Sequence, residues 1–97
     1  MRKSSPLEKR CSEVAEMLKL VAHPNRLLIL CYLVDGDKTV SELEKACGAS
    51  QSSVSQYLSK MRSERIVSAT RDGQSIRYSL SNKEIRLLIE KMKSVFT

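Results

Sequence analysis

Residues 39–64 contain two helical patterns with a very short connection, and this feature limits the fold more than any other in the chain. The first pattern begins with a capping box, in which the Thr39 side chain would accept a hydrogen bond from the Glu42 backbone N–H and the Glu42 side chain would accept one from the Thr39 backbone N–H. Gly48 ends that pattern, and Ser50 can cap a second helix only two residues later. The apolar residues of the second helix recur at three and four and form one face: Val54, Tyr57, Leu58 and Met61. Two helices joined this closely predict a helix-turn-helix.

After residue 64 the apolar residues alternate with a period of about two, which is typical of β-strands. Residues 66–71 and 74–80 have the composition of two strands, and Asp72-Gly73 between them is a strong indicator of a hairpin turn. A hairpin directly after a helix-turn-helix predicts a wing.

Helical periodicity also covers both ends of the chain. Four of the five predicted helices span about 6–22, 24–34, 40–47 and 51–64. The fifth covers the C-terminal residues and begins at a second capping box, Ser81-Asn82-Lys83-Glu84. We therefore predict a mostly α fold with a small β-hairpin, a dimeric winged helix-turn-helix in the order four helices, two strands and one helix. We expect residues 1–97 to form a single domain, with 1–5 as a flexible N-terminus. A domain of this size buries a modest fraction of its surface, so a partner subunit would add core.

Composition narrows the class of partner. The 97 residues carry a net charge of +6, with a pI near 9.5, and such a basic excess attracts polyanions such as nucleic acid. No apolar run reaches the ~18 residues that span a bilayer, and no signal-peptide pattern is present, so we expect a cytoplasmic protein without membrane association. The three cysteines lack C-x-x-C spacing, which favours free thiols over disulfides or a zinc finger.

The second helix of the pair exposes side chains suited to the major groove. Glutamine can read adenine in bidentate fashion, and serine hydroxyls serve bases or phosphates. We predict DNA contacts from this helix at Gln51, Ser52, Ser53, Ser55, Gln56, Ser59 and Lys60. Arg71 and Arg77 on the hairpin suit a phosphate or a narrow minor groove. The alternatives are a merely solvated polar face and ordinary surface arginines.

Three stretches of the chain, 22–30, 50–58 and 71–80, resemble in order and spacing the signature segments of the ArsR/SmtB winged-helix repressors. The resemblance covers about residues 14–96. It implies a DNA-binding transcriptional regulator, usually a repressor, that binds an imperfect inverted repeat of double-stranded DNA as a homodimer. The first and last helices would form the dimer interface through Leu7, Cys11, Val14, Leu18, Ile85, Leu88, Ile89 and Met92.

Members of that family commonly respond to a metal or to a thiol reagent. The positions of the arsenic-type C-x-C site hold Thr39 and Ser41, and the last helix lacks the His and Asp of the zinc-type site. We therefore predict neither familiar metal site and no cofactor. His23, the one histidine, sits beside Pro24 at a helix junction, where a structural or solvated role is more common than ligation.

Cys31 matches the second-helix cysteine of the thiol and reactive-sulfur sensors that include HlyU, BigR and SqrR. The place of their second cysteine falls at Thr97, which cannot form a disulfide. Three interpretations stay open: Cys31 is a core residue, it senses alone through sulfenate, persulfide or mixed disulfide, or Cys11 replaces the missing partner.

Two other functional classes fit the sequence less well than a DNA-binding regulator. A winged-helix protein–protein interaction module would usually lack the basic wing and the uncharged recognition face. An enzyme is disfavoured because the chain has no phosphate-cradling glycine loop and only one histidine to serve as a base near neutral pH. A regulator without any small-molecule response remains compatible with every residue noted above.

Overall fold

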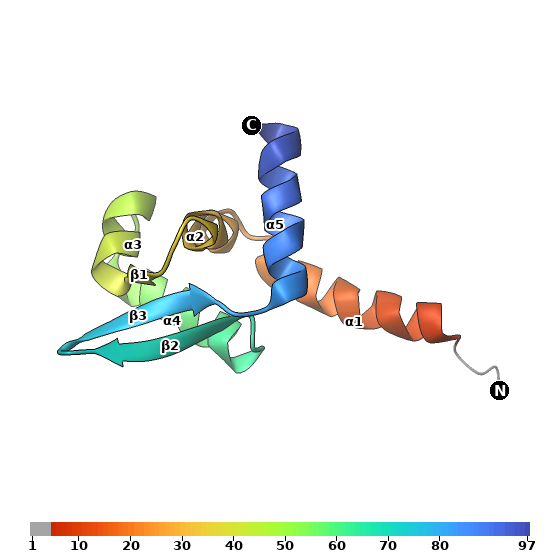
Figure 1. The fold of residues 1–97 in the computed structure, drawn as a ribbon, viewed down its shortest axis with the longest axis horizontal. Coiled ribbons are helices and arrows are strands. Elements are labelled where there is room, and N and C mark those ends of the chain that lie inside the picture. The colour runs from red at the N-terminus through yellow and green to blue at the C-terminus, as the bar shows by residue number, and fades with distance from the viewer. Residues whose placement is uncertain (1–4) are drawn as a thin grey trace.

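The computed structural model describes residues 5–97, and its elements follow the predicted order (Figure 1). The helices and strands are α1 (Pro6–Val21), α2 (Pro24–Val34), β1 (Lys38–Thr39), α3 (Val40–Cys47), α4 (Gln51–Ser63), β2 (Val67–Asp72), β3 (Ser75–Leu80) and α5 (Lys83–Phe96). The predicted winged helix-turn-helix is confirmed, with the ends of its helices and strands within one or two residues of those expected.

The wing contains one strand that the sequence did not indicate. β2 and β3 form the expected antiparallel hairpin, and β1 adds to the other edge of β3 through Lys38–Tyr78 and Thr39–Arg77. A strand of two residues has no periodicity to detect, because it exists only through its partner. It joins the start of α3 to the wing, so the wing and the helix-turn-helix are held together.

Two predicted N-terminal boundaries differ in the structure. The N-cap of α5 is Asn82, whose side chain accepts a hydrogen bond from the Ile85 N–H at 3.0 Å, one residue after the predicted capping box. Ser81 stays with the hairpin because its N–H donates to the Ile66 carbonyl at 3.1 Å. Ser5, placed in the flexible N-terminus, caps α1 by accepting from the Glu8 N–H at 3.1 Å. The remainder of that predicted stretch, residues 1–4, lies outside the described residues.

The core surrounds α2, which Figure 1 shows nearly end-on between α3 and α5. Its middle is apolar nearly all round, and each of the neighbouring elements contributes side chains to the same cluster. The fully buried residues include Ile29, Leu30, Leu33, Leu43, Val54, Leu58 and Met61. This packing covers one face of α4 and leaves its opposite face on the surface.

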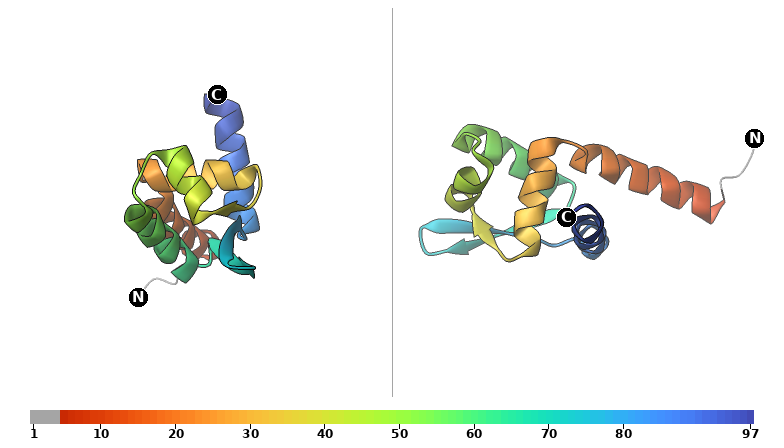
Figure 2. Two further views of the ribbon diagram at one scale, coloured as in Figure 1. Left: turned by 90° about the vertical axis from the view of Figure 1, so that its left-hand side faces the viewer. Right: turned by 90° about the horizontal axis from the view of Figure 1, so that it is seen from above.

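Helix α1 projects away from this core, as Figure 1 and the right-hand view of Figure 2 show. Only Leu20 and Val21, in its last turn, are buried. Leu7 near its start is 73% exposed, and an ion pair between Arg10 and Glu84 links the helix to the start of α5. Most of the apolar stripe on α1 therefore has no cover within the protomer.

Within residues 5–97, the length and apolar character needed to cross a bilayer are found in no single helix. Only α1 and α2 taken together reach them, and the two are bent by 98° at their junction.

Candidate nucleic-acid interface

Helix α4 has one anchored face and one open face. Val54, Leu58 and Met61 are fully buried, and Ser50 caps the helix by accepting a hydrogen bond from the Ser53 N–H at 3.1 Å. Six of the seven residues predicted to contact DNA from this helix are exposed: Gln51, Ser52, Ser55, Gln56, Ser59 and Lys60. The seventh, Ser53, is half-buried, and its Oγ accepts from the Ser50 hydroxyl at 3.0 Å. The structure therefore gathers neutral donors and acceptors along one exposed side of α4.

The chemistry of this side suits a groove of duplex DNA. Amides and hydroxyls can both donate to and accept from base edges, and they present no net charge to repel phosphates. The first turn of α4 has no acidic residue, while Lys60 and Arg62 lie in its last turn. A helix with neutral side chains ahead of basic ones can approach the bases with its first turns and the backbone with its last.

The two wing arginines differ in their surroundings. Arg71 is exposed and has no ion-pair partner among residues 5–97. Arg77 instead turns back toward α3: its Nε donates to Asp72 at 3.1 Å, and its Nη1 lies 3.7 Å from Glu42 and 3.4 Å from the Asp37 carbonyl. Their places in the sequence do not distinguish the two arginines, but in the structure Arg71 is available to a partner, whereas Arg77 connects the wing to Glu42 and the Asp37 carbonyl.

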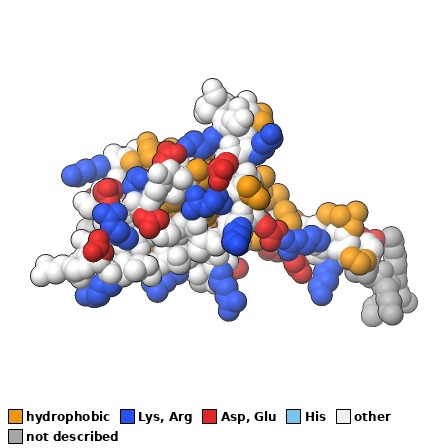
Figure 3. All heavy atoms as spheres, viewed as in Figure 1, with side chains coloured by type: hydrophobic (Ala, Val, Ile, Leu, Met, Phe, Trp, Pro, Cys, Tyr) orange, Lys and Arg blue, Asp and Glu red, His pale blue; other side chains and the backbone are white. Residues whose placement is uncertain are grey.

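The apolar residues predicted for the dimer interface fall into two groups. Leu7, Leu18 and Leu88 are 73%, 40% and 42% exposed, Cys11 is exposed, and Val14 and Met92 are half-buried. Ile85 and Ile89 are only 3% and 1% exposed because the protomer's own core takes them, so their placement at an interface is corrected. Val95 and Phe96, near the end of α5 and outside the predicted interface, are 64% and 79% exposed. Figure 3 shows hydrophobic side chains along α1 and where α1 meets α5.

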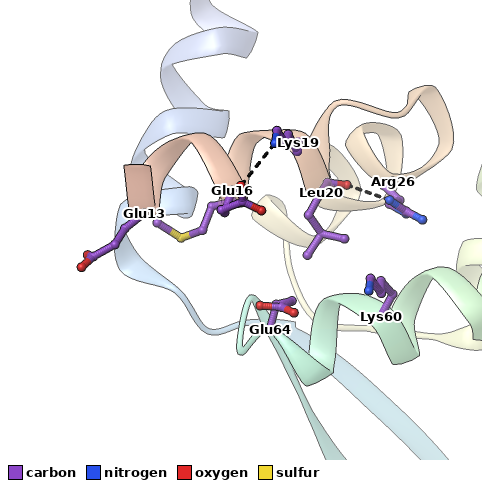
Figure 4. Close-up of a pocket in the computed structure, with 8 residues that line it drawn as sticks. Glu13, Glu16, Lys19, Leu20, Arg26, Lys60 and Glu64 are labelled. Carbon is purple, nitrogen blue, oxygen red and sulfur yellow. Dashed lines mark hydrogen bonds and ion pairs between the residues drawn. The ribbon is translucent and has the colours of Figure 1, made fainter. Parts of the chain in front are cut away.

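A hollow of about 530 Å³ separates α1 from α4 and was not anticipated from the sequence (Figure 4). Its walls carry groups of both signs, and three of them are already engaged: Lys19 pairs with Glu16 at 3.2 Å, and Arg26 donates to the Leu20 carbonyl at 3.2 Å. Glu13, which also lines the hollow, pairs with Arg10 at 3.2 Å, and the remaining charged lining residues are Lys60 and Glu64. Arg26, in the first turn of α2, lies at the α1–α2 junction beside this hollow.

Comparison with known proteins assigns this arrangement to a family. Residues 23–69, which hold the helix-turn-helix, match the family described as "Bacterial regulatory protein, arsR family". Over 97 residues the chain is 37% identical to the HTH-type transcriptional regulator YgaV of Escherichia coli, covering 99% of this chain and 98% of that protein. The chain belongs to the ArsR family.

Other relatives and a solved structure support the same family assignment. This ArsR-family chain is 38% identical to a biofilm growth-associated repressor of Xylella fastidiosa, over 93% of this chain and 79% of that one. It is 33% identical to the transcriptional activator HlyU of Vibrio cholerae, over 93% and 83%. The crystal structure of a predicted DNA-binding transcriptional regulator from E. coli superimposes with a TM-score of 0.90 at 36% identity, covering 97% of this chain and all of that one. The protein is therefore a DNA-binding transcriptional regulator, and its relatives are regulators, not enzymes.

The cysteines of this ArsR-family protein occupy different environments. Cys31 is half-buried against the core, and this burial raises the pKa of its thiol, although the nearby Lys93 ammonium lowers it and Asp35 raises it further. Burial also raises the pKa of Cys47, while Cys11 is exposed on α1. A raised pKa keeps a thiol protonated near neutral pH and slows its reactions, because the thiolate is the nucleophile. Among residues 5–97 no three His, Cys, Asp or Glu side chains lie close enough to hold a metal ion together.

Proposed function

We propose that this ArsR-family regulator is a cytoplasmic homodimeric repressor that binds an imperfect inverted repeat, with one α4 in the major groove of each half-site. The observation that carries the proposal is the exposed neutral side of α4 above a fully buried apolar side. The uncovered apolar residues of α1 and α5 supply a surface for a second copy. A related structure from Mycobacterium bovis, with a TM-score of 0.79 at 26% identity over 98% of this chain and 89% of that one, is described as a homodimeric winged helix-turn-helix DNA-binding domain.

The direct test is selection of binding sites from a pool of randomised duplexes, followed by gel-shift measurement with the recovered site. We expect an inverted repeat whose half-sites lie one helical turn apart, about 10 base pairs from centre to centre. Recovery of sequences without dyad symmetry would contradict the dimeric mode. Recovery of no preferred sequence would instead favour the alternative function, a winged-helix protein interaction module.

Salt dependence separates the two wing arginines. Each phosphate that the protein neutralises contributes about −0.9 to the slope of log affinity against log salt. We expect Arg71→Ala to reduce the magnitude of that slope by about 2 per dimer, one for each protomer. Arg77→Ala is the matched control and should reduce it less, because Asp72 and Glu42 already offset the charge of Arg77. Equal effects of the two substitutions would contradict the assignment of the phosphate contact to Arg71.

We further propose that the protein responds to thiol oxidation or reactive sulfur through Cys31. The partial accessibility of Cys31 on α2 supports this sensing role. The raised pKa of its thiol favours two alternatives, a packing role for Cys31 and a regulator without small-molecule sensing. We expect the alkylation rate of Cys31, measured with Cys11 and Cys47 replaced by serine, to keep rising with pH up to at least its ordinary pKa of 9.0. A rate that reaches its plateau below about pH 8 would reveal a thiolate suited to sensing.

The role of the thiols in regulation is tested separately on operator affinity. Peroxide or persulfide should be added to the unsubstituted protein, Cys31→Ser and Cys11→Ser in parallel. A loss of affinity that requires Cys31 alone supports a one-cysteine sensor, and a loss that requires both cysteines supports a bridge to Cys11. Unchanged affinity in all three proteins would remove thiol sensing from the proposal.

A further inference from the structure

Tyr57 of the recognition helix contacts the α1–α2 junction. It lies on α4 between the exposed Gln56 and the buried Leu58, and its own side chain is half-buried. The ring centroid of His23, the N-cap of α2, is 5.0 Å from that of Tyr57, with the planes inclined by 46°. The Asn25 side-chain amide donates a long hydrogen bond, 3.4 Å, to the Tyr57 hydroxyl. Two residues of the junction therefore contact different parts of one tyrosine.

Arg26 extends this contact to α1. Its guanidinium carbon lies 5.7 Å from the centroid of the Tyr57 ring, within the range of a cation–π interaction. Its Nη1 donates to the carbonyl of Leu20 in the last turn of α1 at 3.2 Å. The Nε is buried and has no hydrogen-bond acceptor among the described residues, so attraction to the ring offsets part of its lost hydration. Arg26 thus joins the end of α1 to the middle of α4 by one side chain.

Because a hollow separates α1 from α4, the contacts at this junction help to set the angle between the two helices. Glu13, Met17 and Lys60 line this open space, so the two helices are separated along it. In a dimer held by α1 and α5, the distance between the two copies of α4 depends on the angle between α1 and α4 within each protomer. Small rotations at the junction would be amplified along α4 and would move its exposed side along the DNA.

We propose that Tyr57, held by His23, Asn25 and Arg26, is a positioning residue that sets the half-site spacing recognised by the dimer. This inference rests on the proposed dimeric function. Tyr57 need not touch a base for this role. Its ring determines where Ser55, Gln56 and Ser59 lie relative to the partner's recognition helix, so it acts on the spacing of the site and not on the sequence of each half-site.

The test measures affinity for a series of operators in which the half-site spacing changes by single base pairs. A shift of one base pair should cost the unsubstituted protein about tenfold in affinity, similar to a mismatch in the site. Tyr57→Leu keeps an apolar side chain in the core but removes the ring, and we expect it to reduce this preference to about twofold. Arg26→Met, which leaves the ring in place, should reduce it in the same direction and serves if Tyr57→Leu does not fold.

Val54→Ala is the matched control, because it weakens the packing of α4 without touching the junction. It should lower affinity equally at every spacing and keep the preference of about tenfold. The inference is overturned if the folded Tyr57→Leu and Arg26→Met proteins keep the preference of the unsubstituted protein, or if Val54→Ala loses it as they do. Failure of the unsubstituted protein to bind an inverted repeat at any spacing would overturn the proposed function and this inference with it.

Discussion

Ser55→Glu is expected to weaken operator binding by about 100-fold or more while leaving the thermal unfolding midpoint within about 2 °C of the unsubstituted value. Ser55 is exposed on α4, so the substitution has little effect on folding. In the complex, each protomer would bring a carboxylate against the phosphates, and like charges placed together cost several kcal/mol. Fluorescence anisotropy with the selected operator measures the loss.

Ser12→Glu provides the control for this substitution. Ser12 is also exposed and helical, but it lies on α1, distant from the side of α4 that we assign to DNA. Both variants change the net charge equally, so a general effect of charge on affinity appears in each. Binding by Ser55→Glu that equals binding by Ser12→Glu would show that this side of α4 does not enter DNA.

Leu88→Glu is expected to weaken dimerisation by at least about 100-fold, and operator binding should fall with it. Leu88 is 42% exposed in the protomer and belongs to the apolar surface of α1 and α5 that we assign to the partner. A dimer would bury two introduced carboxylates without partners, which is costly because an ion at an apolar interface loses its hydration. Sedimentation equilibrium over a range of protein concentrations measures the change.

The adjacent Leu87 gives a control on the same helix. It is 67% exposed, more than Leu88, but points about a quarter turn away from the predicted interface. Leu87→Glu should therefore remain dimeric and bind the operator normally. A monomeric Leu87→Glu together with a dimeric Leu88→Glu would place the interface on a different side of α5.

Local sequence rules account for most of this fold because its elements are short and strongly marked. The capping box at Thr39 and Glu42, the left-handed Gly48 with φ 67° and the Asp72-Gly73 turn each fix a boundary through nearby atoms. β1 and the true cap of α5 depend on contacts with distant residues, respectively β3 and the carbonyl of Ile66. Such contacts leave no periodic pattern in the sequence.

In the candidate site, too, local patterns predict some features and contacts between distant residues determine the others. Helical periodicity identifies the exposed side of α4, because the buried residues Val54 and Leu58 define its opposite side. Periodicity does not say whether an apolar side chain packs inside its own protomer or against another, which is why Ile85 and Ile89 were assigned to the interface. Nor does it reveal that Arg77 turns toward Glu42 while Arg71 does not.

Occupation of successive major grooves by the two copies of α4 is tested by replacing each purine of the selected operator in turn with its 7-deaza analogue. This change removes the N7 acceptor in the major groove and leaves the minor groove as it was. We predict loss of affinity at two clusters of positions related by the operator dyad and centred about 10 base pairs apart. Affinity unchanged at every position, or reduced in one cluster only, would contradict this arrangement.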